Sequence, residues 1–172
     1  MLSDHWVILY LSFFQIDVGG RQKERIKWIH FFDDVKAIIF LAAISEYDQV
    51  LAEDGYTNRL KESVNLFHTI LRYPWFRNTD VVLFLNKMDL LKEKIASGRN
   101  PVQNFFPECP GNDYLTVEEY FRNLFLAQNP NPELQKIYPY ATCATDRNSI
   151  KVVDTAVQVV IRRIILGDSG IH

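Results

Sequence analysis

The stretch that decides the fold is Val81-Val82-Leu83-Phe84-Leu85, which is followed at once by Asn86-Lys87-Met88-Asp89. Five consecutive apolar residues without polar alternation are typical of a short strand that is buried on both faces of a sheet. The four residues that follow place an amide, an ammonium group and a carboxylate at the end of this strand. We therefore expect a ligand site here, because open α/β sheets bind ligands at the carboxyl ends of their strands.

The side chains of this tetrapeptide fit a guanine base. The carboxylate of Asp89 can accept hydrogen bonds from guanine N1–H and from the exocyclic amine, whereas adenine offers no matching pair and would leave the carboxylate unpaired. Asn86 can tie the loop to neighbouring backbone, and the aliphatic stem of Lys87 can lie along the base. A solvated loop after a strand fits the same four residues, because short motifs also match by chance.

Two further segments occupy the same kind of position. Asp17-Val18-Gly19-Gly20 follows the apolar stretch from Leu9 to Ile16, and Thr142-Cys143-Ala144-Thr145 follows the stretch from Ile137 to Ala141. Each segment therefore comes directly after a candidate strand. In a parallel sheet, all three polar segments would meet at one edge.

Strand-like and helix-like segments alternate along the chain, which predicts an α/β fold with a parallel sheet covered on both faces. The capping-box spacing of Thr116-Val117-Glu118-Glu119 predicts that a helix begins there. The stretch from Gly98 to Asn112 contains three prolines and is expected to be irregular. The expected strands are Ile8–Ile16, Ala37–Ala42, Val81–Leu85 and Tyr138–Thr142, and the expected helices are Gln22–Phe32, Asn58–Arg72, Val117–Leu126 and Ile150–Leu166.

Composition favours a globular domain in a reducing compartment. Of the 172 residues, 48% are hydrophobic and the formal net charge is -2, which gives no reason to expect a nucleic acid as partner. Cys109 and Cys143 are expected to be reduced thiols. The apolar segment from Trp6 to Phe14 is short for a membrane span and has no Lys or Arg before it, so we expect a buried strand rather than a signal or anchor.

Several segments of the chain together resemble the α subunit of heterotrimeric G proteins. They are Asp17-Val18-Gly19-Gly20 with Glu24-Arg25-x-Lys27-Trp28, Ser45-Glu46-Tyr47-Asp48-Gln49-Val50-Leu51, Asn86-Lys87-Met88-Asp89-Leu90 and Thr142-Cys143-Ala144-Thr145-Asp146. The resemblance runs from about Phe13 to His172. It implies a partial GTPase domain of the P-loop NTPase (Ras-like) type over residues 13–172, with a mostly parallel sheet, preceded by an atypical apolar segment over residues 1–12.

The resemblance also implies a function. Members of this family bind GTP and GDP with Mg²⁺, hydrolyse GTP, and transduce signals from G-protein-coupled receptors together with a βγ dimer and downstream effectors. The expected location is the cytoplasmic, inner face of the plasma membrane as part of the heterotrimer. Membrane association is expected only through partners or through a missing N-terminus.

Individual roles follow from matching positions. Asp17 would hold magnesium through water, and the direct magnesium ligands are not in this chain. Trp28 fits either a partner contact or plain packing. The nucleotide-binding set is Asp17, Val18, Gly19, Gly20, Asn86, Lys87, Asp89, Cys143, Ala144 and Thr145; the βγ or effector set is Arg25, Lys27 and Trp28; the receptor set is Ile165, Leu166, Gly170, Ile171 and His172.

Two departures from the family pattern bear on activity. The chain contains no Gly-x-x-x-x-Gly-Lys-Ser/Thr, so the P-loop and the strand before it are absent and the sheet is expected to be incomplete. Arg21 stands where the family has the glutamine that orients the attacking water, with Gln22 displaced by one place. A guanidinium has no acceptor and cannot replace that amide, so GTPase activity of this chain is doubtful. The alternative reading of Arg21 is a solvated surface charge.

The departures leave three interpretations of the chain. It is a GTP-binding switch of the family, a truncated interaction protein that binds βγ, receptor or effector without cycling nucleotide, or part of a longer sequence whose P-loop lies upstream. The missing strand would lie between the strand that ends at Asp17 and the strand Ala37–Ala42. We expect a gap there, direct pairing of these two strands, or filling by Met1 to Leu11.

Overall fold

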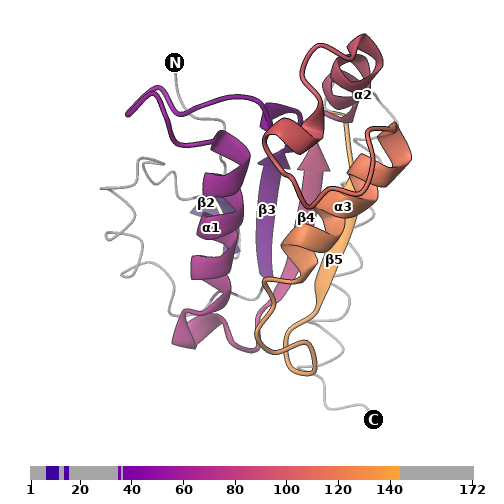
Figure 1. Ribbon diagram of the computed structural model, residues 1–172. Coiled ribbons are helices and arrows are strands. Elements are labelled where there is room, and N and C mark those ends of the chain that lie inside the picture. Colours follow the sequence, from indigo (N-terminus) through magenta and orange to yellow (C-terminus); the bar gives the residue numbers. More distant parts are fainter. Residues whose placement is uncertain (1–6, 12–13, 16–34, 36, 144–172) are drawn as a thin grey trace.

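The computed structural model describes residues 7–11, 14–15, 35 and 37–143 of the chain. These residues contain a five-stranded sheet of order β2-β1-β3-β4-β5, with helices packed against it (Figure 1). The strands are β1 Val7–Leu11, β2 Phe14–Gln15, β3 Ala37–Ala43, β4 Asp80–Asn86 and β5 Ile137–Ala141.

Strands β3, β4 and β5 form a parallel sheet. Ala37 lies opposite Asp80 and Ala43 opposite Asn86, while Leu85 lies opposite Ala141. The five central residues of β4 are all buried, as its unbroken apolar run predicts. The α/β class with a parallel sheet is thus confirmed, and β3 and β4 extend only slightly beyond the predicted ranges. The last strand begins and ends one residue earlier than predicted.

The single strand predicted over Ile8–Ile16 is wrong. Residues 7–11 and 14–15 form two strands that pair antiparallel, with Leu11 opposite Phe14. Strand β1 also pairs antiparallel with β3, so that Ile8 lies opposite Ile39. Of the three arrangements expected beside β3, the structure has the one in which residues from the first eleven positions fill the place.

Three helices are described: α1 Arg59–Leu71, α2 Met88–Ser97 and α3 Tyr114–Leu126. Helix α1 begins one residue after the predicted start, because Asn58 is its N-cap and its side chain accepts a hydrogen bond from the Lys61 N–H at 3.0 Å. The start predicted for α3 at Thr116 is wrong. Asp113 is the N-cap, and its carboxylate accepts from the Thr116 N–H at 3.0 Å. Helix α2 was not predicted.

Short 3₁₀ helices lie in three connections of the described chain: η2 Ile44–Glu46, η3 Pro74–Phe76 and η4 Val102–Asn104. The last of these interrupts the stretch from Gly98 to Asn112 that was expected to be irregular. Element η2 follows β3 without a gap, and its three residues are buried. It therefore begins at the carboxyl edge of the sheet.

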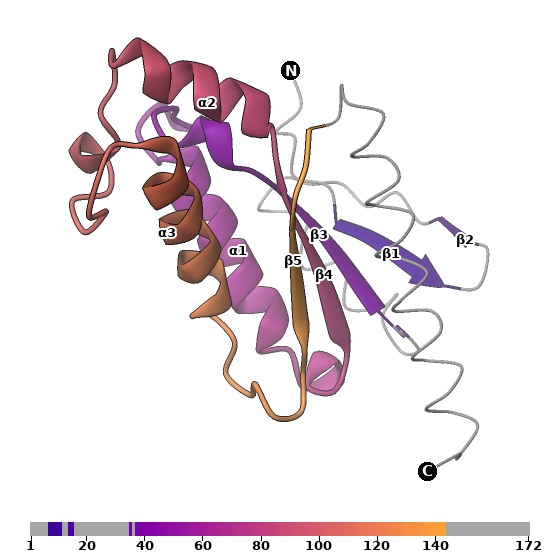
Figure 2. The same ribbon diagram turned by 90° about the vertical axis from the view of Figure 1, so that its right-hand side faces the viewer.

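The main core lies between the sheet and helices α1 and α3, which cover the same face (Figure 2). Phe40 of β3 meets Phe67 of α1 and Phe125 of α3, with ring centroids 4.8 and 6.2 Å apart. The opposite face carries a smaller cluster, in which the ring centroids of Phe84 and Tyr140 lie 5.9 Å apart. The other two predicted helices, Gln22–Phe32 and Ile150–Leu166, lie outside the described residues.

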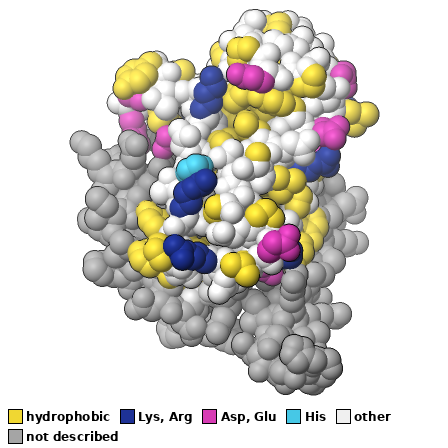
Figure 3. Space-filling model, turned by 60° about the horizontal axis from the view of Figure 1, so that its bottom comes forward, with side chains coloured by type: hydrophobic (Ala, Val, Ile, Leu, Met, Phe, Trp, Pro, Cys, Tyr) yellow, Lys and Arg dark blue, Asp and Glu magenta, His cyan; other side chains and the backbone are white. Residues whose placement is uncertain are grey.

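The surface of the described chain is chemically mixed. In the face drawn in Figure 3, acidic, basic and hydrophobic side chains are interspersed. Large exposed hydrophobic residues such as Tyr56, Leu115 and Leu134 come from separate segments, and isolated exposures of this kind are normal. None of the described helices has the length and apolar character needed to cross a membrane.

Candidate functional site

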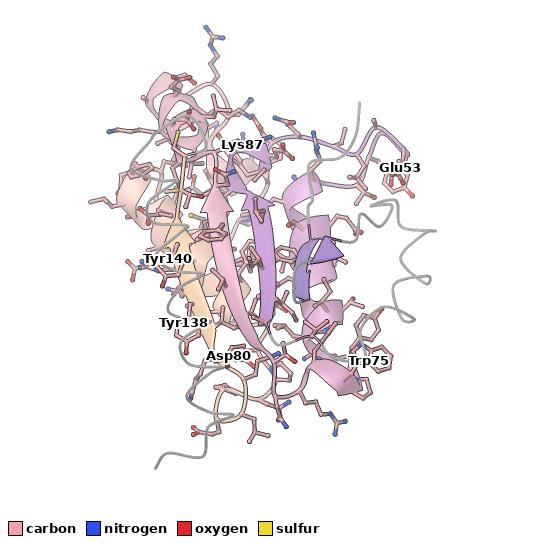
Figure 4. All side chains as sticks on the ribbon, turned by 180° about the vertical axis from the view of Figure 1, so that it is seen from behind. Glu53, Trp75, Asp80, Lys87, Tyr138 and Tyr140 are labelled. Atoms are coloured by element: carbon pink, nitrogen blue, oxygen red, sulfur yellow. The ribbon has the colours of Figure 1, made fainter. Side chains whose placement is uncertain are left out.

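The three parallel strands end side by side, and a polar segment follows each of them. Ala43 and Asn86 are register partners, as are Leu85 and Ala141. Lys87 comes directly after the end of β4, while Glu46 and Cys143 follow the ends of β3 and β5 within three residues. Figure 4 shows Lys87 at the carboxyl end of β4, with Asp80 at the opposite end. The edge predicted to bind a ligand is therefore built from η2, the loop after β4 and the residues after β5.

Asn86 joins the loop after β4 to the segment after β5. Its side-chain oxygen accepts a hydrogen bond from the Lys87 N–H at 2.8 Å, and the Thr142 hydroxyl lies 3.4 Å from the same oxygen. The backbones are also joined, because the Met88 N–H donates to the Thr142 carbonyl at 3.3 Å and the Thr142 N–H to the Leu85 carbonyl at 2.8 Å. These contacts hold the two loops in one arrangement.

Lys87 has a left-handed backbone conformation, with φ of 63°, and is the one non-glycine residue with positive φ in the described chain. Such a conformation costs about 1–3 kcal/mol and persists only where the surroundings fix it. Here the residue is held at three points. Its N–H donates to Asn86, its carbonyl accepts from the Leu91 N–H at 3.1 Å, and its ammonium lies 2.8 Å from Glu46 Oε1.

Asp89 lies in the first turn of α2, next to the helix N-terminus, and is partly buried. A carboxylate in the first helical turn is stabilised by the unpaired N–H groups and the helix dipole. A position on a helix that begins at the strand end also fixes the carboxylate more firmly than a free loop would. The predicted base-reading residue therefore has a fixed position at the carboxyl edge of the sheet.

Glu46 is the most buried charged residue at this edge that the structure describes, with 4% of its surface exposed. Its Oε2 lies 2.9 Å from Arg59 Nε, and its Oε1 lies 2.8 Å from Lys87 Nζ. Each carboxylate oxygen thus has its own cation. Charge-assisted hydrogen bonds of this kind are stronger than neutral ones and satisfy a carboxylate that would be costly to bury alone.

A second polar cluster fixes the turn after β3 to α2. The Lys94 ammonium contacts the Asp48 carboxylate and also donates to the Ser45 carbonyl at 2.8 Å. Asn100 donates to Asp48 at 2.8 Å, while its carbonyl accepts from the Tyr47 hydroxyl at 2.7 Å. Burial, assisted by the charge of Asp48, raises the pKa of Tyr47 to about 12. Tyr47 therefore stays protonated and keeps donating.

The sequence identified Asn86, Lys87, Asp89 and Cys143, and the structure brings the segments that carry them to one edge. It missed the roles of Glu46, Arg59, Asp48 and Lys94. The available signal for Glu46 was its place three residues after a buried strand that ends at that edge. The remaining predicted site residues lie outside the described residues: Asp17, Val18, Gly19, Gly20, Arg21, Gln22, Arg25, Lys27, Trp28, Ala144, Thr145, Ile165, Leu166, Gly170, Ile171 and His172.

The described residues contain no group of three His, Cys, Asp or Glu side chains that could hold a metal ion. Glu46 and Asp48, the acidic residues that follow β3, are each engaged by a cation. Asp17, the residue predicted to hold magnesium through water, lies outside the described part of the chain.

The chain matches the family model described as G-protein alpha subunit over residues 9–161. It is also 44% identical, over 168 residues, to the guanine nucleotide-binding protein alpha-1 subunit of Mycosarcoma maydis. That similarity covers 97% of this chain and 47% of the relative, so the chain spans about half the length of the curated relative it matches. The chain belongs to the G-protein alpha subunit family.

Proposed function

We propose that this chain carries the guanine-recognising half of an alpha-subunit GTPase domain. The observation that supports this most is the junction of Asn86 with Thr142, which joins the loop after β4 to the loop after β5 beside Asp89. The members of the family are GTPases that bind guanine nucleotides. Signalling from G-protein-coupled receptors by this chain is the finer proposal that follows from its membership.

In this proposal, Asp89 accepts two hydrogen bonds from the base, from N1–H and from the exocyclic amine. The stem of Lys87 packs along the ring, while Asn86 keeps the loop closed against Thr142. Cys143, Ala144 and Thr145 complete the wall of the site. Adenine is rejected because it would leave the Asp89 carboxylate without donors, which costs about 1–3 kcal/mol.

The phosphate side is proposed from the resemblance. Asp17 would hold magnesium through water, and the Gly20 N–H would bind the γ-phosphate in the segment Asp17-Val18-Gly19-Gly20. Because the 172 residues contain no P-loop motif, we expect phosphate binding to be weak. Each charge-assisted phosphate contact is worth about 1.5–3 kcal/mol, so the loss of several weakens GTP binding by many powers of ten.

Hydrolysis is proposed to be slow where Arg21 and Gln22 keep their present order. In a longer form that carries a P-loop, single-turnover hydrolysis should accelerate when the two residues are exchanged to Gln-Arg, because the amide then reaches the attacking water. An unchanged rate after the exchange would remove Arg21 as the cause.

Partner binding is proposed on the same basis. Arg25, Lys27 and Trp28 would contact a βγ dimer or an effector, and the C-terminal residues from Ile165 to His172 would contact a receptor. These contacts would place the chain at the inner face of the plasma membrane through its partners.

The proposed base recognition is tested on the full chain by titration with GMP and with AMP, followed by NMR chemical shifts. We expect GMP to shift the signals of Asn86, Lys87, Asp89 and Thr142, with AMP at least tenfold weaker, in line with one unpaired carboxylate. Equal responses to the two nucleotides, or none to either, would refute base recognition. If the purified chain still carried stoichiometric GDP, the expectation of weak phosphate binding would be refuted.

One observation favours a second candidate function. Strand β1 lies beside β3, where the resemblance would put the strand that leads into the P-loop. A chain whose sheet is completed in this way would act as a non-hydrolysing interaction protein that binds βγ, receptor or effector without cycling nucleotide. Binding of a βγ dimer that is unaffected by added GTP or GDP would favour this candidate over the switch.

A further inference from the structure

We propose that Glu46 is a positioning residue for base recognition: its buried carboxylate, anchored by Arg59, holds the Lys87 side chain in place across the base-binding edge. The inference rests on the proposed guanine site and adds a residue to it. Glu46 contacts the lysine and has no assigned contact with the base, so its role is to fix Lys87 rather than to bind the base.

The burial of the three side chains shows which of them is the fixed point. The Glu46 side chain is 5% exposed, compared with 18% for Arg59 and 29% for Lys87. A buried carboxylate has to be paired, and each of its oxygens has one cation, at 2.9 and 2.8 Å. The lysine is the most exposed member and is therefore the one that is held.

The anchor is itself rigid. Arg59 is the first residue of α1, and the preceding Asn58 both caps that helix and donates to the Tyr47 carbonyl at 2.6 Å. The Arg59 N–H also donates to the Gln49 carbonyl at 2.9 Å. The start of α1 is thus attached to the turn after β3 by backbone and side chain. Glu46 has little freedom to follow a moving lysine.

Lys87 is fixed at both ends of its side chain. Its backbone conformation is set by the hydrogen bonds to Asn86 and Leu91, and its ammonium is set by Glu46. Between these two points lies the aliphatic stem, which runs from the end of β4 toward η2. A lysine stem held in this way offers a pre-formed apolar surface to a flat base, whereas a free lysine would lose rotamer freedom on binding.

The direct test is competitive acylation of the full chain with limiting acetic anhydride, read by peptide mass spectrometry. We expect Glu46→Gln to raise the acylation rate of Lys87 about fivefold, the effect of losing one partly exposed ion pair. Lys94, which pairs with Asp48, is the internal reference and should not change. Glu53→Gln, which alters an exposed carboxylate in the loop after β3, is the matched control and should leave both rates unchanged. A Lys87 rate that is the same in Glu46→Gln and in the parent chain overturns the proposal.

Two further variants separate positioning from loss of fold. Arg59→Gln should raise the Lys87 rate by a smaller factor, because the carboxylate remains but loses its anchor. If Glu46→Gln unfolds the chain, the rates of Lys87 and Lys94 rise together, and Glu46→Asp then decides. Its carboxylate is one methylene shorter and cannot reach both cations, so the Lys87 rate should rise while that of Lys94 does not. An unchanged Lys87 rate in Glu46→Asp, in a chain where Glu46→Gln unfolds, overturns the proposal.

Titration with GMP tests whether the ion pair between Glu46 and Lys87 assists base binding. We expect Glu46→Gln to weaken GMP binding about fivefold and Glu53→Gln to leave it unchanged. If Lys87 is released in Glu46→Gln without any loss of GMP affinity, the ion pair between Glu46 and Lys87 does not assist base binding, and this overturns the positioning role. A parent chain that protects Lys87 but binds no GMP refutes the proposed function and reduces Glu46 to a structural ion pair, so the two failures are distinguishable.

Discussion

Replacing Lys94 with methionine should destabilise the chain by about 2 kcal/mol. The ammonium of Lys94 contacts Asp48, whose side chain is 6% exposed, donates to the Ser45 carbonyl at 2.8 Å, and lies 5.5 Å from the centre of the Tyr47 ring. Removing one partner of a fully buried ion pair costs about 3–5 kcal/mol. The cost here is lower because Lys94 is 30% exposed and Asp48 keeps the hydrogen bond from Asn100.

The assay is equilibrium unfolding in urea, with Lys92→Met as the matched control on the same helix. Lys92 is exposed and lies 5.9 Å from the centre of the Tyr114 ring. Its replacement should change the free energy of unfolding by at most about 1 kcal/mol, the value of an exposed cation–π contact. Asp48→Asn, combined with Lys94→Met in a double-mutant cycle, isolates the pair itself. Equal effects of Lys92→Met and Lys94→Met would refute the conclusion that this pair holds α2 to the turn after β3.

Three smaller predictions concern the same framework. The pKa of Tyr47 is raised from 10.0 to about 12 in the folded chain. The free energy of unfolding should therefore be unaffected by this group below pH 10 and should fall by about 2–3 kcal/mol as the pH rises toward 12. Urea titrations of Tyr47→Phe should lack this fall. Asn58→Ala should cost about 1–2 kcal/mol through the lost cap of α1, against less than about 0.5 kcal/mol for the exposed mid-helix change Asn65→Ala. Gln135→Leu should cost about 1–3 kcal/mol, because the buried amide donates to two backbone carbonyls at 2.7 and 2.9 Å; a loss below 0.5 kcal/mol by thermal unfolding would contradict this.

The central strands were predictable because burial on both faces leaves an unmistakable pattern. The run Val81 to Leu85 has no polar residue, and the polar tetrapeptide directly after it marked the carboxyl edge. The helix predicted to start at Asn58 was also recovered, and the structure shows Asn58 to be its N-cap. These features depend on short stretches of sequence, which is why a single chain was enough to predict them.

The antiparallel pairing of β1 with β2 was not predictable in the same way. The apolar stretch from Trp6 to Phe14 is interrupted only by Ser12 and contains no Gly, Pro, Asn or Asp to indicate a turn. One continuous strand was therefore the simplest interpretation. The pairing of β1 with β3 is a long-range contact, and nothing local in the sequence specifies it.

Helix α2 and the start of α3 were missed for local reasons. In α2 only Met88 and Leu91 are buried, so it has almost no apolar stripe to indicate a helix. At the start of α3, Asp113 and Thr116 are both good N-cap residues, and the capping-box pattern favoured the wrong one. The left-handed conformation of Lys87 is rare for a residue with a side chain, and its cause lies in contacts with other segments.

The role of Glu46 shows the limit for the candidate site. The sequence gives it no metal partner and no catalytic neighbour. Its role depends on two cations, Arg59 and Lys87, which follow it by 13 and 41 positions in the chain and contact it only after folding. Ion-pair partners at such separations are set by the packing of α1 and β4 on β3, which composition and periodicity do not specify.

The measurement that tests the central claim most directly is the preference for the base at Asp89, taken from paired titrations with GMP and xanthosine monophosphate. In the proposed site, the carboxylate of the parent chain accepts from N1–H and the exocyclic amine of guanine, so we expect GMP to bind more tightly. In Asp89→Asn, the amide offers one acceptor and a donor, which matches xanthine, because xanthine carries an oxygen in place of the amine. We expect the preference to reverse by about ten- to a hundredfold, the equivalent of one charge-assisted hydrogen bond. An Asp89→Asn chain that still prefers GMP, by the same factor as the parent, would contradict the assignment of this edge as a guanine site.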